Sequence, residues 1–161
     1  MRRLATIGVY DWDLDSFIDA LHEAEVGLLL DVRQRRGVRG SEYAWANAQR
    51  LEAALWDADI AYAHMPQLAP TTELRQVQYT EDERAGEGKR SRTRLAPAYV
   101  ERFTREILDA ADLDPVVEVM PHDAATALLC VERDPEACHR SLVADELARS
   151  YGFPVVHLLP A

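Results

Sequence analysis

The sequence predicts a single three-layer α/β domain of the Rossmann-like kind, with a mainly parallel sheet of about five strands flanked by helices. Short apolar runs alternate with segments of helical period along the whole chain, as in strand–helix–strand units. Several of these runs are continuously apolar, which is typical of parallel strands buried on both faces. The length of 161 residues suits one domain, and no internal linker divides residues 1–161.

Five short runs rich in β-formers are the expected strands, and they cover residues 4–9, 27–32, 60–64, 126–131 and 154–159. The expected helices begin at capping signals. These signals are Asp13, Ser41 (for a helix to about Asp57), Pro97, Asp114-Pro115 and Asp134-Pro135 (for a helix ending before Gly152). Residues 69–96 show no clear period and contain many basic residues, so we expect a mobile basic loop insertion there.

The charge of the chain is unevenly distributed. The 28 acidic and 18 basic residues give a net charge of −10, which argues against general binding to bulk duplex nucleic acid or to an anionic membrane. Residues 33–39 and 84–94, however, contain half of the basic residues and a single acid, so these windows sum to +8 on a body of −18. This pattern predicts a local site for a small anionic ligand.

Cysteine usage and the N-terminus bear on the expected compartment. Two cysteines are too few for a disulfide scaffold, and neither a signal peptide nor an apolar run of membrane-spanning length is recognisable. We therefore expect a soluble cytoplasmic protein without membrane contacts. The sequence makes no prediction of oligomeric state.

Polar residues gather where the expected strands end. Asp31 and Arg33 follow the second strand, His64 ends the third, and Cys130 and Glu132 end the fourth. Because ligands of such sheets bind beyond the carboxyl ends of the strands, we expect a site at this edge.

The most informative segment joins the fourth strand to the last expected helix. It places Cys130 at the strand end and Cys138-His139-Arg140 in the first helical turns, where a helix N-terminus lowers a thiol pKa and attracts anions. In this setting His139 can carry a proton, Arg140 can bind a phosphate or carboxylate, and Glu132 can act as a base or orient an arginine.

These motifs resemble the domain-of-unknown-function 488 family of bacterial and archaeal proteins. The resemblance covers nearly the whole chain. It is carried by Thr6-Ile7-Gly8, Asp31-Val32-Arg33 with Arg39, Tyr62-x-His64 before Pro66 and Leu68, Leu129-Cys130-x-Glu132 with Cys138-His139-Arg140, and His157. It implies a Rossmann-like fold with a polar site at the strand ends, and it implies no particular activity.

The chain departs from the family pattern at three places. Val9 and Tyr10 stand where the family usually has His and Ser, and Ala69 stands where it usually has Gly. The stretch 36–39 replaces a Pro-x-Ser-Arg motif. The resemblance therefore implies the family architecture with part of the chemistry changed or lost.

Three functional classes remain open from the sequence. The first is a cysteine- or carboxylate-dependent hydrolase or transferase acting on a small phosphorylated or nucleotide-like substrate. Its candidate catalytic residues are Cys138, His139, Glu132, Asp31 and Cys130. Its candidate substrate-binding residues are Arg33, Arg39, Arg140, His64, Tyr10 and His157. The second class is a non-catalytic module that binds a nucleotide, a nucleic-acid end or a protein.

The third class is a metal-binding protein, with zinc or iron ligands among Cys130, Cys138, His139, His64 and His157. The Cys-x7-Cys-His spacing is not a standard zinc signature, so we predict no cofactor and keep the metal as a minor alternative. Structural roles also compete with the functional ones. Each cysteine suits a buried core position, and Asp31 suits an ion pair with a nearby arginine.

Overall fold

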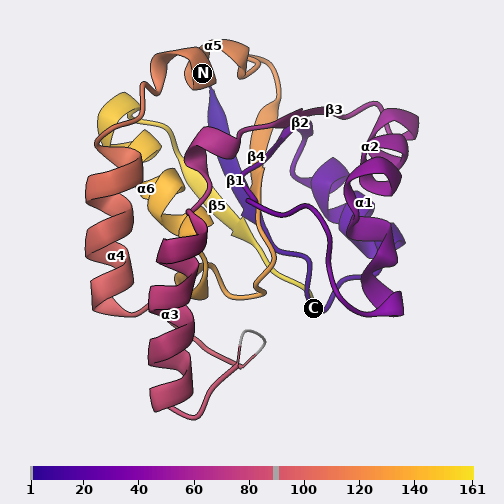
Figure 1. The fold of residues 1–161 in the computed structure, drawn as a ribbon. Helices are drawn as coiled ribbons and strands as arrows, with labels where there is room; N and C mark the ends of the chain where they lie inside the picture. The colour runs from indigo at the N-terminus through magenta and orange to yellow at the C-terminus, as the bar shows by residue number, and fades with distance from the viewer. Residues whose placement is uncertain (1, 89–90) are drawn as a thin grey trace.

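The computed structural model describes residues 2–88 and 91–161 and contains a five-stranded, all-parallel sheet between two layers of helices (Figure 1). The strands lie in the order β3-β2-β4-β1-β5. Their bounds are β1 Arg3–Ile7, β2 Val26–Asp31, β3 Ala61–His64, β4 Ala125–Leu129 and β5 Val155–Leu158. The predicted fold class is confirmed.

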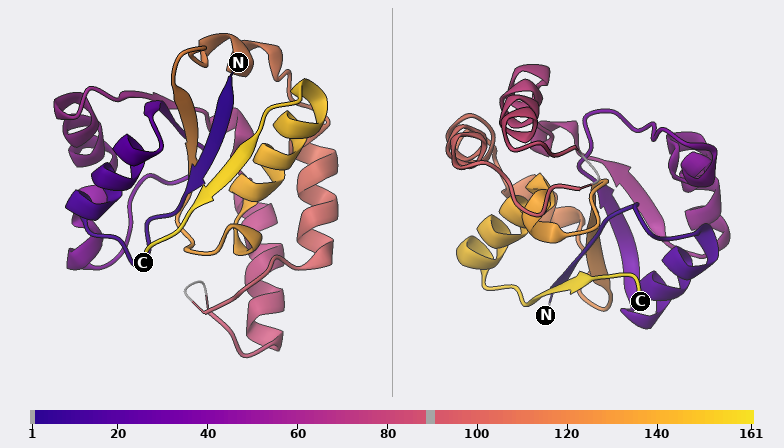
Figure 2. Two further views of the ribbon diagram at one scale, coloured as in Figure 1. Left: turned by 180° about the vertical axis from the view of Figure 1, so that it is seen from behind. Right: turned by 90° about the horizontal axis from the view of Figure 1, so that it is seen from below.

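The helices cover both faces of the sheet (Figures 1 and 2). On one face lie α1 (Leu14–Glu23) and α2 (Ala48–Asp57). On the other lie α3 (Thr72–Arg84), α4 (Pro97–Phe103, extended by a π-helical turn over Thr104–Leu108) and α6 (His139–Tyr151). The short α5 (Asp114–Val119) lies near the amino ends of the strands (Figure 1).

The central position of β4 determines where the site lies. It pairs with β1 through Ile7↔Leu129 and with β2 through Asp31↔Leu129, so three strands end at one level. All five residues of β4 are buried, as expected for an interior parallel strand. The segments that follow β1, β2 and β4 therefore meet at one edge of the sheet.

Two predicted helix starts are wrong, although the predicted Asp13 cap of α1 is confirmed and forms a capping box with Ser16. Ser41–Ala46 forms a 3₁₀ helix, and α2 begins only at Ala48. Pro135–Ala137 is likewise a 3₁₀ turn, and α6 begins at His139. The reason is that Cys138 has an extended backbone (φ −135°, ψ 142°), which interrupts the helix and makes this residue its N-cap.

The expected loop over residues 69–96 contains the regular helix α3, whose first turn Thr71 caps by accepting a hydrogen bond from Leu74 N. The helical period was not visible because the buried face of α3 is largely polar: Gln78 and Asp82 are buried beside Leu74. Lys89 and Arg90 lie outside the described residues.

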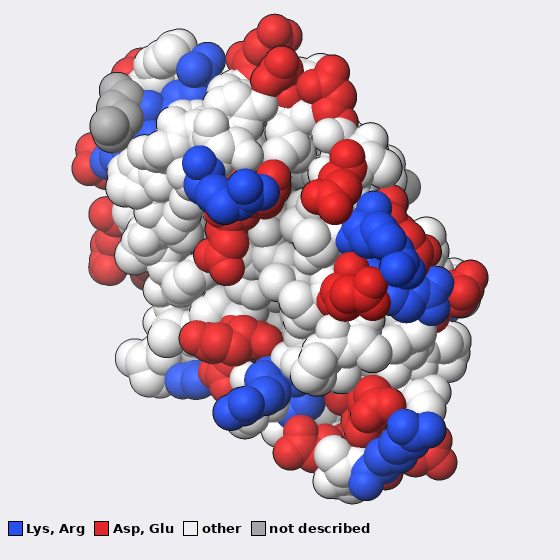
Figure 3. Space-filling model, turned by 90° about the vertical axis from the view of Figure 1, so that its left-hand side faces the viewer, with Lys and Arg blue, Asp and Glu red and all other residues white. Residues whose placement is uncertain are grey.

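The surface over α4 carries both signs of charge in small neighbouring groups (Figure 3). Arg102 pairs with Glu73 and Glu106, and Arg105 pairs with Glu101. Within the described part of the chain, no helix is both long and apolar enough to cross a membrane.

Gly8 connects the end of β1 to the segment after β4. A Cβ at Gly8 would lie 2.0 Å from the carbonyl oxygen of Glu132, so the backbones approach closely at this point. We expect Gly8→Ala to lower the free energy of unfolding by about 1–3 kcal/mol or more, because the Glu132 backbone must move. Chemical denaturation measures the loss. Gly88→Ala is the matched control, since nothing lies within 4 Å of its Cβ position, and equal stability of the two variants would contradict the close approach.

Candidate active site

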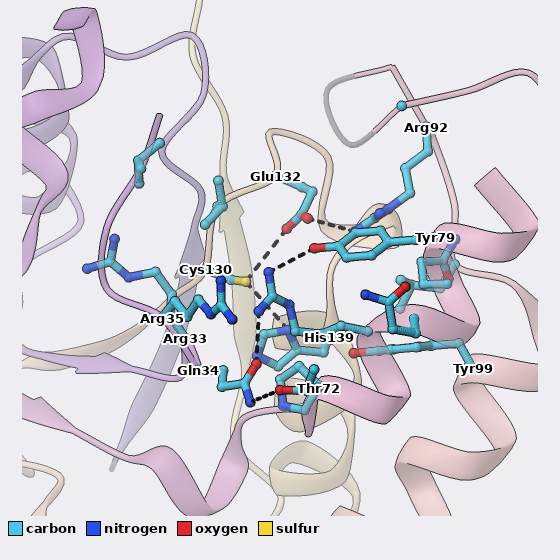
Figure 4. A pocket seen from close by; sticks show the side chains of 18 of the residues that line it. Arg33, Gln34, Arg35, Thr72, Tyr79, Arg92, Tyr99, Cys130, Glu132 and His139 are labelled. Atoms are coloured by element: carbon cyan, nitrogen blue, oxygen red, sulfur yellow. Dashed lines mark hydrogen bonds and ion pairs between the residues drawn. The ribbon is translucent and has the colours of Figure 1, made fainter. Parts of the chain in front are cut away.

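A pocket of about 720 Å³ opens at the carboxyl edge of the sheet. The loop after β2 forms one side with Arg35, α3 and α4 form the other with Tyr79 and Tyr99, and Cys130 and His139 lie between them (Figure 4). We call this cavity the central pocket. Its position is the one predicted for a ligand of a parallel α/β sheet.

Three donor side chains meet at the base of the central pocket, and we call Cys130, Cys138 and His139 the Cys/His cluster. Cys130 and His139 line the pocket floor, and Cys138 is buried beside them. The Nδ1 atom of His139 lies 3.5 Å from Cys130 Sγ and 3.9 Å from Cys138 Sγ. On the other side of the ring, Nε2–H donates to the carbonyl oxygen of Val32 at 2.6 Å. The lone pair of Nδ1 in the neutral ring therefore faces both sulfur atoms.

The pKa values of the two thiols are shifted in opposite directions. Burial raises the pKa of Cys130 well above its ordinary value, and its hydrogen bond to Cys138 adds to the rise. Burial opposes ionisation of Cys138 too, but the Cys130 hydrogen bond and the charges of His139 and Arg140 lower its pKa well below the ordinary value. Burial alone would lower the pKa of His139, whereas the neighbouring Cys138 raises it. The cluster therefore favours ionisation of Cys138 over ionisation of Cys130.

A buried ion-pair network positions Glu132 beside the cluster. Arg92 donates to Glu132 Oε1 at 2.6 Å and to Asp82 Oδ2 at 2.8 Å. The second carboxylate oxygen of Glu132 lies 3.6 Å from Cys130 Sγ. Gln78 completes the network by donating to Asp82 and accepting from Ala96 N. Because α3 supplies Gln78 and Asp82, this polar helix face positions Arg92, which in turn holds the carboxylate of Glu132.

Asp31 and Arg33 form a buried pair with each other. The carboxylate accepts two bonds from the Arg33 guanidinium, at 2.9 and 2.8 Å, and one from Tyr62 Oη at 2.6 Å. The remaining Arg33 nitrogen donates to Ala46 O. Burial raises the pKa of Tyr62 to about 12, so this phenol stays a donor at neutral pH. This geometry matches the structural ion pair considered as an alternative role for Asp31.

Arg140 also binds the protein itself. It lies fully buried and donates to the carbonyl oxygens of Glu132 and Arg133, at 2.5 and 3.0 Å. These bonds fix the backbone between β4 and α6.

The rim of the central pocket carries further basic side chains. Arg75 donates to Gln34 Oε1 and to Tyr79 Oη, each at 2.9 Å, and its guanidinium lies 5.6 Å from the Tyr79 ring centre. Arg35 is exposed at the opposite side. Among residues 2–88 and 91–161, neither Arg35 nor Arg75 forms an ion pair with a carboxylate.

Aromatic rings support the floor. The ring of Phe103 lies 5.5 Å from that of His139 and stacks on Tyr99 at 5.9 Å. Burial raises the pKa of the Tyr99 phenol, and the nearby thiols raise it further, so the hydroxyl stays protonated. Tyr99 thus gives the pocket a hydrogen-bond donor close to the cluster.

The structure brings many of the predicted site residues together. Six of them line the central pocket: Cys130, Glu132, His139, Arg33, Arg39 and Tyr10. Cys138 lies directly behind this floor.

Other candidates lie apart from the pocket lining. The guanidinium of Arg140 and the carboxylate of Asp31 face protein partners. His64 bonds the carbonyl oxygen of Arg33, and His157, on the outer strand β5, bonds Thr6 of β1. Trp12 and Trp45 also lie apart from the pocket lining and pack on Phe17.

Sequence reasoning missed Gln34, Arg75, Tyr79 and Tyr99. The spacing of Arg75 and Tyr79, four residues apart on one helix, was the available signal, but α3 itself was not recognised.

The fold and site define a Rossmann-like α/β protein with a cysteine–histidine cluster at the carboxyl edge of its sheet. The chain belongs to the family described as domain of unknown function DUF488, which matches residues 13–147. Thr6-Ile7-Gly8 and His157, two of the features that suggested the family, lie outside the matched residues. No curated protein and no solved structure matches the chain.

Proposed function

We propose that this protein is an enzyme that binds a small anionic substrate in the central pocket and converts it with the Cys/His cluster and Glu132. The observation that carries the proposal is the position of two arginines, Arg35 and Arg75, around a pocket whose floor presents Cys130 and His139. The reaction class that fits these groups is hydrolysis or group transfer.

The anionic character of the substrate follows from the charges at the rim. Gln34 and Tyr79 orient the guanidinium of Arg75. Within the described residues, no carboxylate neutralises its positive charge. An arginine preorganised in this way suits a phosphate or carboxylate group. The volume of about 720 Å³ is that of a pocket for a small molecule, and it is too small for a bulk duplex.

The floor supports catalysis over binding alone. An imidazole nitrogen 3.5 Å from a sulfur atom, with a carboxylate 3.6 Å from the same sulfur, is an arrangement that can move protons. Glu132 and His139 are each fixed by a further hydrogen bond, to Arg92 and to Val32 O. A plain binding site needs no such buried reactive groups.

Calorimetric titration with a panel of phosphorylated and carboxylated small molecules tests the proposal. We expect at least one compound to bind, and Arg35→Ala or Arg75→Ala to weaken its binding about tenfold or more, because each removes a charge-assisted hydrogen bond of about 1.5–3 kcal/mol. Arg105→Ala is the matched control, since Arg105 pairs with Glu101 on the surface. Absence of binding, or an equal effect of the control, would refute the anionic site.

Catalysis is tested with the same compounds. Cys130→Ser and Glu132→Gln are expected to abolish conversion while binding persists. If the wild-type protein binds these compounds but converts none of them, the proposal of an enzyme is refuted and the protein is a binding module.

A further inference from the structure

We infer that the Cys/His cluster is a metal site for a divalent ion of the zinc class, with its fourth coordination position open to the central pocket. Metal binding itself depends on the cluster alone. The part the ion would play in the reaction rests on the proposed function.

The spacing of the donor atoms fits tetrahedral coordination. With zinc–sulfur and zinc–nitrogen bonds of about 2.3 and 2.05 Å, tetrahedral ligands lie about 3.8 Å (S to S) and about 3.6 Å (S to N) apart. The distances from His139 Nδ1 to the sulfurs of Cys130 and Cys138 are 3.5 and 3.9 Å. All three donor atoms lie within 4.8 Å of one another. One ion can therefore contact all three after minor side-chain adjustment.

The histidine is oriented as a ligand. Metal-bound histidines generally donate their second N–H to a protein oxygen, which fixes the ring and its tautomer. His139 does so through Nε2–H to Val32 O at 2.6 Å, and Phe103 packs 5.5 Å from its ring. Nδ1 is thereby directed at the two sulfur atoms.

The chemistry of the donors selects the class of ion. Two sulfurs and one imidazole nitrogen suit zinc and related transition metals, whereas magnesium and calcium require oxygen ligands. The ligands are placed by rigid elements, because Cys130 follows β4, Cys138 is the N-cap of α6 and His139 is its first residue. This combination of strand end and helix start explains why the ligand spacing matches no standard zinc signature.

The remaining position of the ion would be accessible to a substrate. Cys130 and His139 line the central pocket, and Glu132 extends a carboxylate oxygen to 3.6 Å from Cys130 Sγ. Three protein ligands with an open fourth position are the pattern of catalytic zinc, in contrast to closed structural sites. An ion there would polarise an oxygen of the anion held by Arg35 and Arg75.

Metal analysis of the full-length protein tests the inference. We expect the wild-type protein, purified without chelator from zinc-supplemented cells, to contain about one zinc per chain by mass spectrometry. Cys130→Ser, Cys138→Ser and His139→Gln should each reduce this content to near zero. His64→Gln and His157→Gln are matched controls, because both histidines bond elsewhere, and they should keep the metal.

Cobalt substitution gives a readout that needs no variant. Co²⁺ added to chelator-treated wild-type protein should produce a thiolate-to-metal charge-transfer band and the strong visible bands of tetrahedral cobalt, and zinc should abolish both. A wild-type protein without zinc and without cobalt bands would overturn the site. So would a Cys130–Cys138 disulfide in protein kept under reducing buffer.

The two proposals fail in different ways. Arginine-dependent binding of an anion by a protein that takes up no metal would refute the metal site alone. One bound zinc in a protein that binds no anion would refute the proposed function alone.

Discussion

Replacing Asp31 with alanine is expected to lower the free energy of unfolding by about 3–5 kcal/mol, because it leaves the Arg33 guanidinium buried without its carboxylate. The Arg33 side chain is 1% exposed and the Asp31 side chain 0%, so water cannot replace the lost partner. The Tyr62 hydroxyl loses its acceptor as well. Such a loss is a large part of the 5–15 kcal/mol typical of a domain and is measured by urea or guanidinium denaturation.

Two further variants define the cause. Glu52→Ala removes the exposed pair with Arg36, whose side chains are 34% and 48% accessible, and should cost at most about 1 kcal/mol. The double change Asp31→Leu with Arg33→Met removes both buried charges and should regain part of the loss. If Asp31→Ala costs no more than Glu52→Ala, the buried pair does not stabilise the fold as argued.

Arg92→Met should also cost about 3–5 kcal/mol, since it removes a buried partner of Asp82 and Glu132. The side chain of Arg92 is 7% exposed and bonds in addition to Ala137 O, next to Cys138. We therefore expect loss of stability together with loss of any activity, because Glu132 is no longer held beside the cluster. Denaturation and assays on the identified substrate measure the two effects.

Arg84→Met is the control for this change. Arg84 is also basic and pairs with Glu81, but its side chain is 73% exposed, so its removal should change stability by at most about 1 kcal/mol. Arg92→Lys keeps a charge but cannot donate to three acceptors in the same geometry, and it should be intermediate. Equal stability of the Arg92→Met and Arg84→Met proteins would contradict the network.

The fold was predictable because its signals are local. Each strand is a short apolar run, and Asp13, Pro97 and the Asp114-Pro115 pair marked helix starts that the structure confirms. The order of the strands depends instead on long-range pairing. Nothing in the apolar run of β4 indicated that it lies between β1 and β2, which is the pairing that brings Cys130 close to the segment after Asp31.

Helix α3 was missed for a different reason. Its buried face carries Gln78 and Asp82, and a hydrophobic period cannot reveal a helix that buries polar groups. These buried groups bond to each other and to partners beyond the end of the helix: Asp82 accepts from Arg92, and Gln78 accepts from Ala96 N.

Most of the arginines that the structure describes in the two basic windows, residues 33–39 and 84–94, are bound to carboxylates of the protein, which their net charge did not reveal. Arg33 and Arg92 are neutralised by buried carboxylates, and Arg36 and Arg84 pair at the surface with Glu52 and Glu81. Counting charges along the sequence could not separate these structural arginines from Arg35, which lines the pocket. Whether an arginine is structural or free to bind a ligand depends on the carboxylates that the fold brings near its guanidinium.

The most direct measurement is a crystal structure of the protein with the tightest-binding compound of the titration panel. The proposed function predicts density for its anionic group within hydrogen-bonding distance of Arg35 and Arg75, with the rest of the molecule over Cys130 and His139. Density at any other place on the protein, with the central pocket containing solvent alone, would contradict it.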